Sequence, residues 1–129
     1  GHLFFSRVAT GRKMGYAYEI HGTKGSIRFD QEDQNALHLY TMDGPEEEKG
    51  FKKILTGPAH PDYQAFCQGP GHGTGYQDQI IIEANDFLRA IYEKRNIWPT
   101  FSEGMEVNRV VSAALDSSEK SIWVKISDY

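Results

Sequence analysis

One long segment without secondary-structure periodicity divides this chain and constrains its fold more than any other feature. Residues 56–79 contain five of the thirteen glycines, three of the five prolines and the only cysteine. Neither the two-residue period of a strand nor the 3.6-residue period of a helix continues through them. A loop this long in a compact domain is usually functional or disordered. We favour an ordered loop, because Tyr63, Phe66, Cys67 and Tyr76 are residue types that fold into interiors and are scarce in disordered tracts.

The chain before this loop alternates between apolar and polar residues, as strands do. Within residues 36–41, for example, Leu37 and Leu39 alternate with His38 and Tyr40. Consecutive strands joined by short polar or glycine-containing turns predict an antiparallel meander. Five strands are expected in this half, at residues 3–9, 16–20, 26–30, 36–41 and 51–55.

After the loop the apolar residues change to helical spacing. Residues 80–92 predict an amphipathic helix, with Thr74 or Gly75 near its N-cap and Asp78 in its first turn. Asn96, which tolerates left-handed backbone, is expected to end it together with two preceding basic residues.

A second helix is expected to start at Ser102 as its cap and to carry an apolar stripe through residues 105–115. Residues 122–126 predict a last strand. The sequence therefore predicts one α+β domain over residues 1–129, with a mostly antiparallel open-faced sheet and two helices on one face.

Composition excludes several classes of partner. The net charge is −4 and there is no basic tract, which excludes nucleic acid as the expected partner. No apolar run approaches the length of a membrane span, so no membrane association is expected. A single cysteine forms no internal disulfide, which fits a cytoplasmic protein.

The open face of the predicted sheet has two interpretations. Apolar or aromatic residues occur at neighbouring positions, such as Phe4 with Phe5 and Leu39 with Tyr40, so both faces of some strands are partly apolar. A large uncovered apolar face indicates an interface between copies of the chain. The alternative is an ordinary sheet with one solvated face that carries scattered aromatics. We favour the interface.

The loop supplies the candidate binding residues. His60, His72 and Tyr76 are the side chains that we expect it to present, with Asp78 close behind them. A carboxylate beside a histidine is suited to acid–base work, although Asp78 at a helix start is more commonly structural. The plainer alternative is that the aromatics of the loop fill one end of a core and both histidines are solvated.

Other chemistries fit the loop less well. The glycines of residues 69–75 do not form the dinucleotide pattern G-x-G-x-x-G, and no P-loop lysine follows them. His60, Cys67 and His72 match no compact zinc spacing and have no evident fourth ligand. A Cys67-dependent hydrolase would need a histidine that activates the thiol, which the sequence does not indicate. No catalytic set, metal site or cofactor site is expected in the chain itself.

Several runs of sequence together resemble one enzyme family. In the first half these runs are residues 5–11 (FSRVATG), 18–29 (YEIHGTKGSIRF) and 35–40 (NALHLY). In the loop and the helices they are residues 60–63 (HPDY), 66–67 (FC), 70–72 (PGH), 75–78 (GYQD), 86–91 (DFLRAI), 98–101 (WPTF) and 104–107 (GMEV). In this order they resemble the C-terminal domain of the Gfo/Idh/MocA oxidoreductases, which include glucose–fructose oxidoreductase and inositol dehydrogenase. The loop resembles a sugar- and polyol-dehydrogenase branch.

The resemblance implies a two-domain enzyme. A Rossmann domain binds NAD or NADP, while the C-terminal domain covers a sugar or polyol substrate and forms homo-oligomers through its open sheet. The family's catalytic lysine and its D-x-x-x-H pair lie upstream of the matched part, and no D-x-x-x-H occurs here. We therefore expect a chain that lacks the Rossmann domain and is inactive alone.

The resemblance also implies which side chains meet the substrate. His72 and Tyr76 are expected to contact sugar hydroxyls, with His60 and Asp78 in the same substrate-facing loop. The competing hypothesis is a stand-alone interaction module that dimerises without redox activity.

Overall fold

The computed structural model describes residues 1–129. They form two units, Gly1–Gln79 and Ile80–Tyr129. The first contains a four-stranded antiparallel sheet and the first turn of helix α1, and the second contains the rest of α1 and all of helix α2. This content confirms the predicted α+β class.

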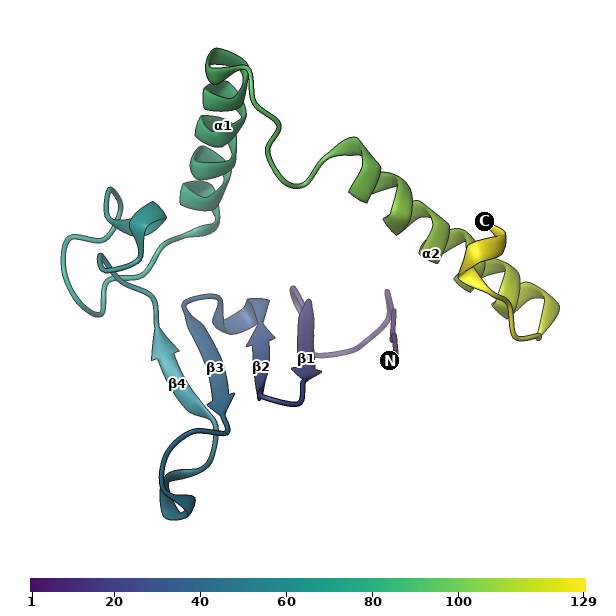
Figure 1. The fold of residues 1–129 in the computed structure, drawn as a ribbon, viewed down its shortest axis with the longest axis horizontal. Helices are drawn as coiled ribbons and strands as arrows, with labels where there is room; N and C mark the ends of the chain where they lie inside the picture. Colours follow the sequence, from purple (N-terminus) through teal and green to yellow (C-terminus); the bar gives the residue numbers. More distant parts are fainter. The chain divides into compact units, whose positions relative to one another are not determined.

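The sheet is the antiparallel meander that the alternation predicted. Its strands lie side by side in chain order, β1-β2-β3-β4 (Figure 1). They are β1 (Ala17–His21), β2 (Gly25–Asp30), β3 (Ala36–Thr41) and β4 (Lys52–Leu55). Short connections between neighbours allow each strand to pair with the next one along the chain.

The strand register separates the side chains of the sheet into two chemically different faces. Because side chains alternate along a strand, Ile27 and its partner Leu39 lie on one face while Arg28 and its partner His38 lie on the other. The apolar face carries Tyr18, Ile20, Ile27, Phe29, Leu37, Leu39 and Ile54, with Lys52 opposite Leu39 at the start of β4. The polar face carries Glu19, His21, Ser26, Arg28, His38, Tyr40 and Lys53.

The polar face also has an aromatic pair. Tyr40 and Phe51 lie with their ring centroids 6.4 Å apart, and the Arg28 guanidinium lies 5.3 Å from the Phe51 centroid. A cation at this distance over an aromatic ring is attracted to its face. Leu39 and Tyr40, which are neighbours in sequence, therefore lie on opposite faces of the sheet.

Two predicted strands are wrong. Residues 3–9 form no strand, and Phe4, Phe5 and Val8 are exposed. Residues 122–126 also join no sheet, and a short 3-10 helix, η4 (Ile126–Asp128), begins where that strand was expected to end. Strand propensity mainly measures how well a residue packs on a pleated surface, so an apolar run without a partner strand stays irregular.

Helix α1 (Tyr76–Glu93) begins inside the segment that was expected to be loop. The Asp78 carboxylate accepts a hydrogen bond from the Gly75 amide at 2.7 Å, as expected of an acidic residue in the first turn. The left-handed residue at the other end is Lys94, with φ of 52°, and not Asn96.

Helix α2 (Phe101–Lys120) is capped two residues earlier than predicted. Thr100, not Ser102, is the N-cap, and its amide donates to the Glu103 carboxylate at 2.8 Å. This T-x-x-E spacing is that of a capping box. The pKa of Glu103 lies below its ordinary value because the Thr100 hydroxyl and amide both donate to it. Neither helix combines the length and the hydropathy needed to cross a membrane.

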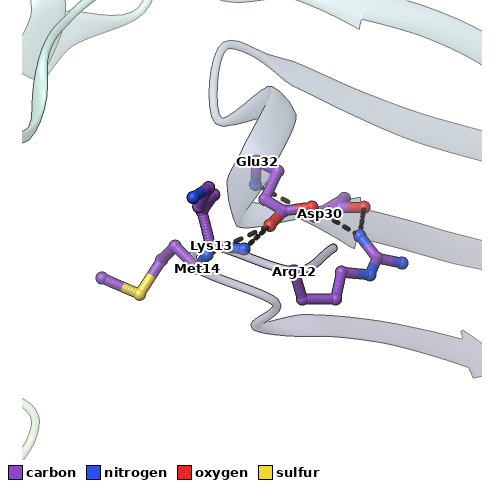
Figure 2. A network of polar contacts seen from close by, with 5 residues as sticks. All are labelled: Arg12, Lys13, Met14, Asp30 and Glu32. Atoms are coloured by element: carbon purple, nitrogen blue, oxygen red, sulfur yellow. Dashed lines mark hydrogen bonds and ion pairs between the residues drawn. The ribbon is translucent and has the colours of Figure 1, made fainter. Parts of the chain in front are cut away.

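A polar network holds the turn before β1 against the end of β2 (Figure 2). Glu32 lies in the 3-10 helix η1 (Gln31–Asp33) and accepts hydrogen bonds from the amides of Lys13 at 2.7 Å and Met14 at 3.0 Å. The Arg12 guanidinium lies 2.6 Å from the Glu32 carboxylate and 3.3 Å from that of Asp30. The pKa of Glu32 is lowered to about 2, mainly by the hydrogen bond from the Lys13 amide and next by the one from the Arg12 side chain.

Replacing Glu32 by Gln should lower the melting temperature at neutral pH. A carboxylate whose folded-state pKa is depressed stabilises the fold above its ordinary pKa, and this contribution is lost as the pH falls toward the folded-state pKa. The difference in melting temperature between wild type and Glu32→Gln should therefore shrink between pH of about 4.5 and about 2. Thermal melts across this range measure it, with Glu47→Gln, at an exposed position, as the control. A difference that is equal at both ends of the range would contradict the assignment.

Candidate functional site

The loop between β4 and α1 is anchored to the sheet by one side-chain amide. Asn35, directly before β3, accepts a hydrogen bond from the Thr74 amide at 2.8 Å through Oδ1. Its Nδ2 donates to the Thr74 carbonyl oxygen at 2.9 Å. Both backbone hydrogen-bonding groups of Thr74 are thus paired with a single side chain. Thr74 is 4% exposed, so leaving these groups unpaired would be costly.

Asn35 also holds the beginning of the loop. The Thr56 hydroxyl donates to Asn35 Oδ1 at 2.7 Å, and the Thr56 amide donates to the Asn35 carbonyl at 2.9 Å. Gln34 adds a second donor to the Thr74 carbonyl, at 2.9 Å. One residue therefore joins both ends of the loop at the edge where β3 begins and β4 ends.

Gly73 is required by this close approach and not by its backbone angles. A Cβ at Gly73 would lie 2.3–2.6 Å from the Asn35 side-chain atoms Cγ, Oδ1 and Nδ2, which is closer than a real carbon atom approaches them. Gly71 has a different reason, because its φ is +84° and L-residues rarely adopt that region. Gly71 and Gly73 thus serve two different purposes in the loop.

The first half of the loop is held by local contacts. His60 Nδ1 lies 3.2 Å from both the amide nitrogen and the carbonyl oxygen of Gly57. The ring centroids of His60 and Tyr63 are 6.1 Å apart, across the short 3-10 helix η3 (Pro61–Tyr63). The Cys67 amide donates to the Tyr63 carbonyl at 2.9 Å, and the Cys67 side chain is buried as a free thiol. A buried cysteine in such surroundings behaves as a small apolar residue.

The four predicted binding residues take different positions. His72 and Tyr76 are exposed and lie on either side of the anchored residues 73–75. Asp78 is half-buried, and its Oδ2 is already used at the start of α1. His60 belongs to the separate turn that begins at Gly57. His72 and Tyr76 therefore flank the anchored stretch at its two ends, and Asp78 holds the Gly75 amide within it.

Asn35 is the residue that sequence reasoning missed. Residues 31–35 form one of the short polar connections between the predicted strands, and asparagine is common in turns. Its contact with Thr74 spans 39 positions, and no local period or spacing marks such a contact. The structure contains no group of three or more His, Cys, Asp or Glu side chains arranged to hold a metal ion.

A separate hollow of about 510 Å³ lies in the first unit. Charged residues of both signs line it, among them Arg12, Glu19, Arg28 and Asp30. None of the four predicted binding residues contributes to it. It belongs to the sheet and the turn before β1, not to the loop.

Comparison with known proteins identifies close relatives. The model of the Gfo/Idh/MocA oxidoreductase family, C-terminal alpha/beta domain, matches residues 5–126. Levoglucosan dehydrogenase of Pseudarthrobacter phenanthrenivorans is 36% identical over 126 residues, which are 98% of this chain and 32% of that protein.

Solved structures agree with this relationship. Levoglucosan dehydrogenase in complex with NADH and levoglucosan matches with a TM-score of 0.84 and 38% identity over 92% of this chain and 32% of that one. An oxidoreductase domain protein from Kribbella flavida matches with a TM-score of 0.86 and 42% identity, over 94% and 31% of the two chains. The chain thus spans about a third of the length of these relatives. It belongs to the Gfo/Idh/MocA oxidoreductase family and corresponds to that family's C-terminal alpha/beta domain.

Proposed function

We propose that this chain is the substrate-binding and oligomerisation domain of an NAD(P)-dependent sugar or polyol oxidoreductase, and that it is inactive alone. The main support is its similarity, over 98% of its length, to part of levoglucosan dehydrogenase. Structures of that enzyme carry NADH together with levoglucosan or L-sorbose, which favours NAD and a sugar here. Cofactor binding and hydride transfer are assigned to a Rossmann domain outside these residues. We assign the enzyme to the cytoplasm, in keeping with its single unpaired cysteine.

In this proposal the loop recognises sugar hydroxyls mainly through two side chains that can each donate and accept a hydrogen bond. A neutral imidazole offers one donor and one acceptor, and a phenol hydroxyl offers both, so His72 and Tyr76 match the dual character of a sugar hydroxyl. Both side chains are exposed, while the backbone between them is held by Asn35 and Asp78. A backbone that is ordered before binding reduces the entropy lost on binding. His60 Nε2 and Asp78 Oδ1 are proposed as further polar contacts.

The proposal is tested by comparing this chain with a longer protein that carries it behind a Rossmann domain. Each is mixed with NAD or NADP and a panel of sugars and polyols that includes levoglucosan and L-sorbose, and absorbance of the reduced nicotinamide is followed. The longer protein should turn over at least one substrate, and this chain alone should turn over none. Turnover by the chain alone would contradict the assignment of hydride transfer to another domain. An inactive longer protein would favour a non-redox interaction module.

In the longer enzyme, His72→Ala and Tyr76→Phe should each lower kcat/KM by about five- to a hundred-and-fifty-fold. An unpaired polar group in a desolvated site costs roughly 1–3 kcal/mol, and 1.36 kcal/mol corresponds to a tenfold change. The melting temperature should barely change, because both side chains are exposed. Tyr92→Phe, at an exposed tyrosine on α1, is the matched control. Unchanged kinetics with a lowered melting temperature would assign the two residues a structural role instead.

We also propose that copies of the chain associate through the sheet. The sequence favoured an uncovered apolar face as the contact. We assign the contact instead to the polar face, which also carries the aromatic pair Tyr40 and Phe51, because Glu19 pairs there with Arg28 across the strands and Arg28 pairs with His38. Residues of opposite charge on one face allow the same patch on two copies to be complementary. A standard interface of this kind buries about 1,600 Å² in total.

Light scattering at micromolar concentration should therefore give the mass of a dimer or a larger oligomer. Arg28→Glu should shift the mass toward the monomer, because it places like charges in the contact. Lys52→Glu makes the same charge reversal at a position on the opposite face and serves as the control. A monomeric wild type would contradict the proposal, and dissociation by Lys52→Glu alone would assign the contact to the apolar face.

A further inference from the structure

We propose that Asn35 is a positioning residue for substrate binding: it sets the directions of His72 and Tyr76 without touching the substrate itself. This inference rests on the proposed function of the loop. Asn35 is part-buried and contributes hydrogen bonds to Thr74 and Thr56 from a position directly before β3.

The chemistry of the anchor requires an amide. Asn35 donates to the Thr74 carbonyl and accepts from the Thr74 amide, so the side chain must offer a donor and an acceptor at the same time. An aspartate would keep the acceptor but would place a carboxylate oxygen against the Thr74 carbonyl oxygen. An alanine would remove both contacts and would leave Gln34 as the remaining donor to the Thr74 carbonyl.

The geometry connects this anchor to the binding residues. His72 precedes Thr74 by two positions and Tyr76 follows it by two, so the peptide units that orient both lie in the anchored stretch. On the far side the Asp78 carboxylate holds the Gly75 amide at 2.7 Å. On the near side Asn35 fills the space that a Cβ at Gly73 would need. The backbone between the two binding residues therefore cannot reorient without breaking a contact to Asn35 or Asp78.

Positioning has a measurable signature that differs from simple stabilisation. A small displacement of binding groups by a distant substitution can cost on the order of a hundredfold in catalytic efficiency. We expect Asn35→Ala to lower kcat/KM for the sugar by roughly tenfold to a hundredfold. The KM for the nicotinamide cofactor should stay unchanged. Asn35→Asp should lose at least as much as Asn35→Ala, because it keeps the acceptor for the Thr74 amide but sets a carboxylate oxygen against the Thr74 carbonyl oxygen.

The experiment uses the longer enzyme for kinetics and this chain for amide hydrogen exchange. Asn35→Ala, Asn35→Asp and Gly73→Ala are compared with Asp33→Asn, which breaks the nearby exposed ion pair with Lys53 and leaves the anchor intact. Exchange of the Thr74 and Gly75 amides is measured below the melting transition of every variant. We expect faster exchange at these amides and the sugar-specific kinetic loss in the three anchor variants, and neither in Asp33→Asn.

The possible outcomes separate this inference from the proposed function. Wild-type turnover with unchanged sugar kinetics in both Asn35 variants would overturn the positioning role, even if the variants melt earlier. A wild-type enzyme inactive on every sugar and polyol would overturn the proposed function instead. In that case only the role of Asn35 as an anchor is tested, by hydrogen exchange. Faster exchange confined to the Thr74 and Gly75 amides supports that role, and unchanged exchange overturns it. Equal losses for sugar and cofactor would indicate general damage to the fold and would also overturn the inference.

Discussion

The rest of the loop depends on the two hydrogen bonds between the Asn35 side chain and the Thr74 backbone. Asn35 also continues the pairing of β3 with β4 by one position, because Ala36 pairs with Leu55 and the Thr56 amide donates to the Asn35 carbonyl. The loop thus leaves the sheet and returns to it at the same residue. The entropic cost of bringing the loop ends together is met when the chain folds. The exposed residues near the end of the loop therefore have an ordered backbone before any ligand binds.

The sequence predicted the parts of the fold that follow from local periodicity. Strands β1 to β4 were found within a residue or so because each alternates and each neighbour in the sheet is also a neighbour in the chain. The strands expected at residues 3–9 and 122–126 failed for the opposite reason. Their composition is strand-like, but a strand needs a partner, and partner choice is not a local property.

In the candidate site, too, local sequence pattern identified some residues, whereas residues placed by long-range contacts were missed. His72 and Tyr76 could be predicted as presented residues because glycines and the onset of helical spacing mark where the loop ends. Asn35 could not be predicted, since a side-chain amide in a polar turn looks the same whether it faces solvent or a residue 39 positions away. The role of Gly73 could not be predicted either, because a glycine that permits close approach looks the same in sequence as one that permits a turn.

The chemistry of the loop accounts for a division of labour within the proposed enzyme. His72 and Tyr76 offer donors and acceptors, whereas Cys67 is buried and Asp78 already holds a backbone amide. Such a set is suited to selecting a substrate more than to transforming it. A site built to pair with hydroxyl groups rejects an analogue that lacks one, because the buried partner is then left unpaired. This selectivity requires that the partner cannot turn away to find another hydrogen bond. A loop whose backbone is held between His72 and Tyr76 comes closer to that requirement than a flexible loop of the same composition would.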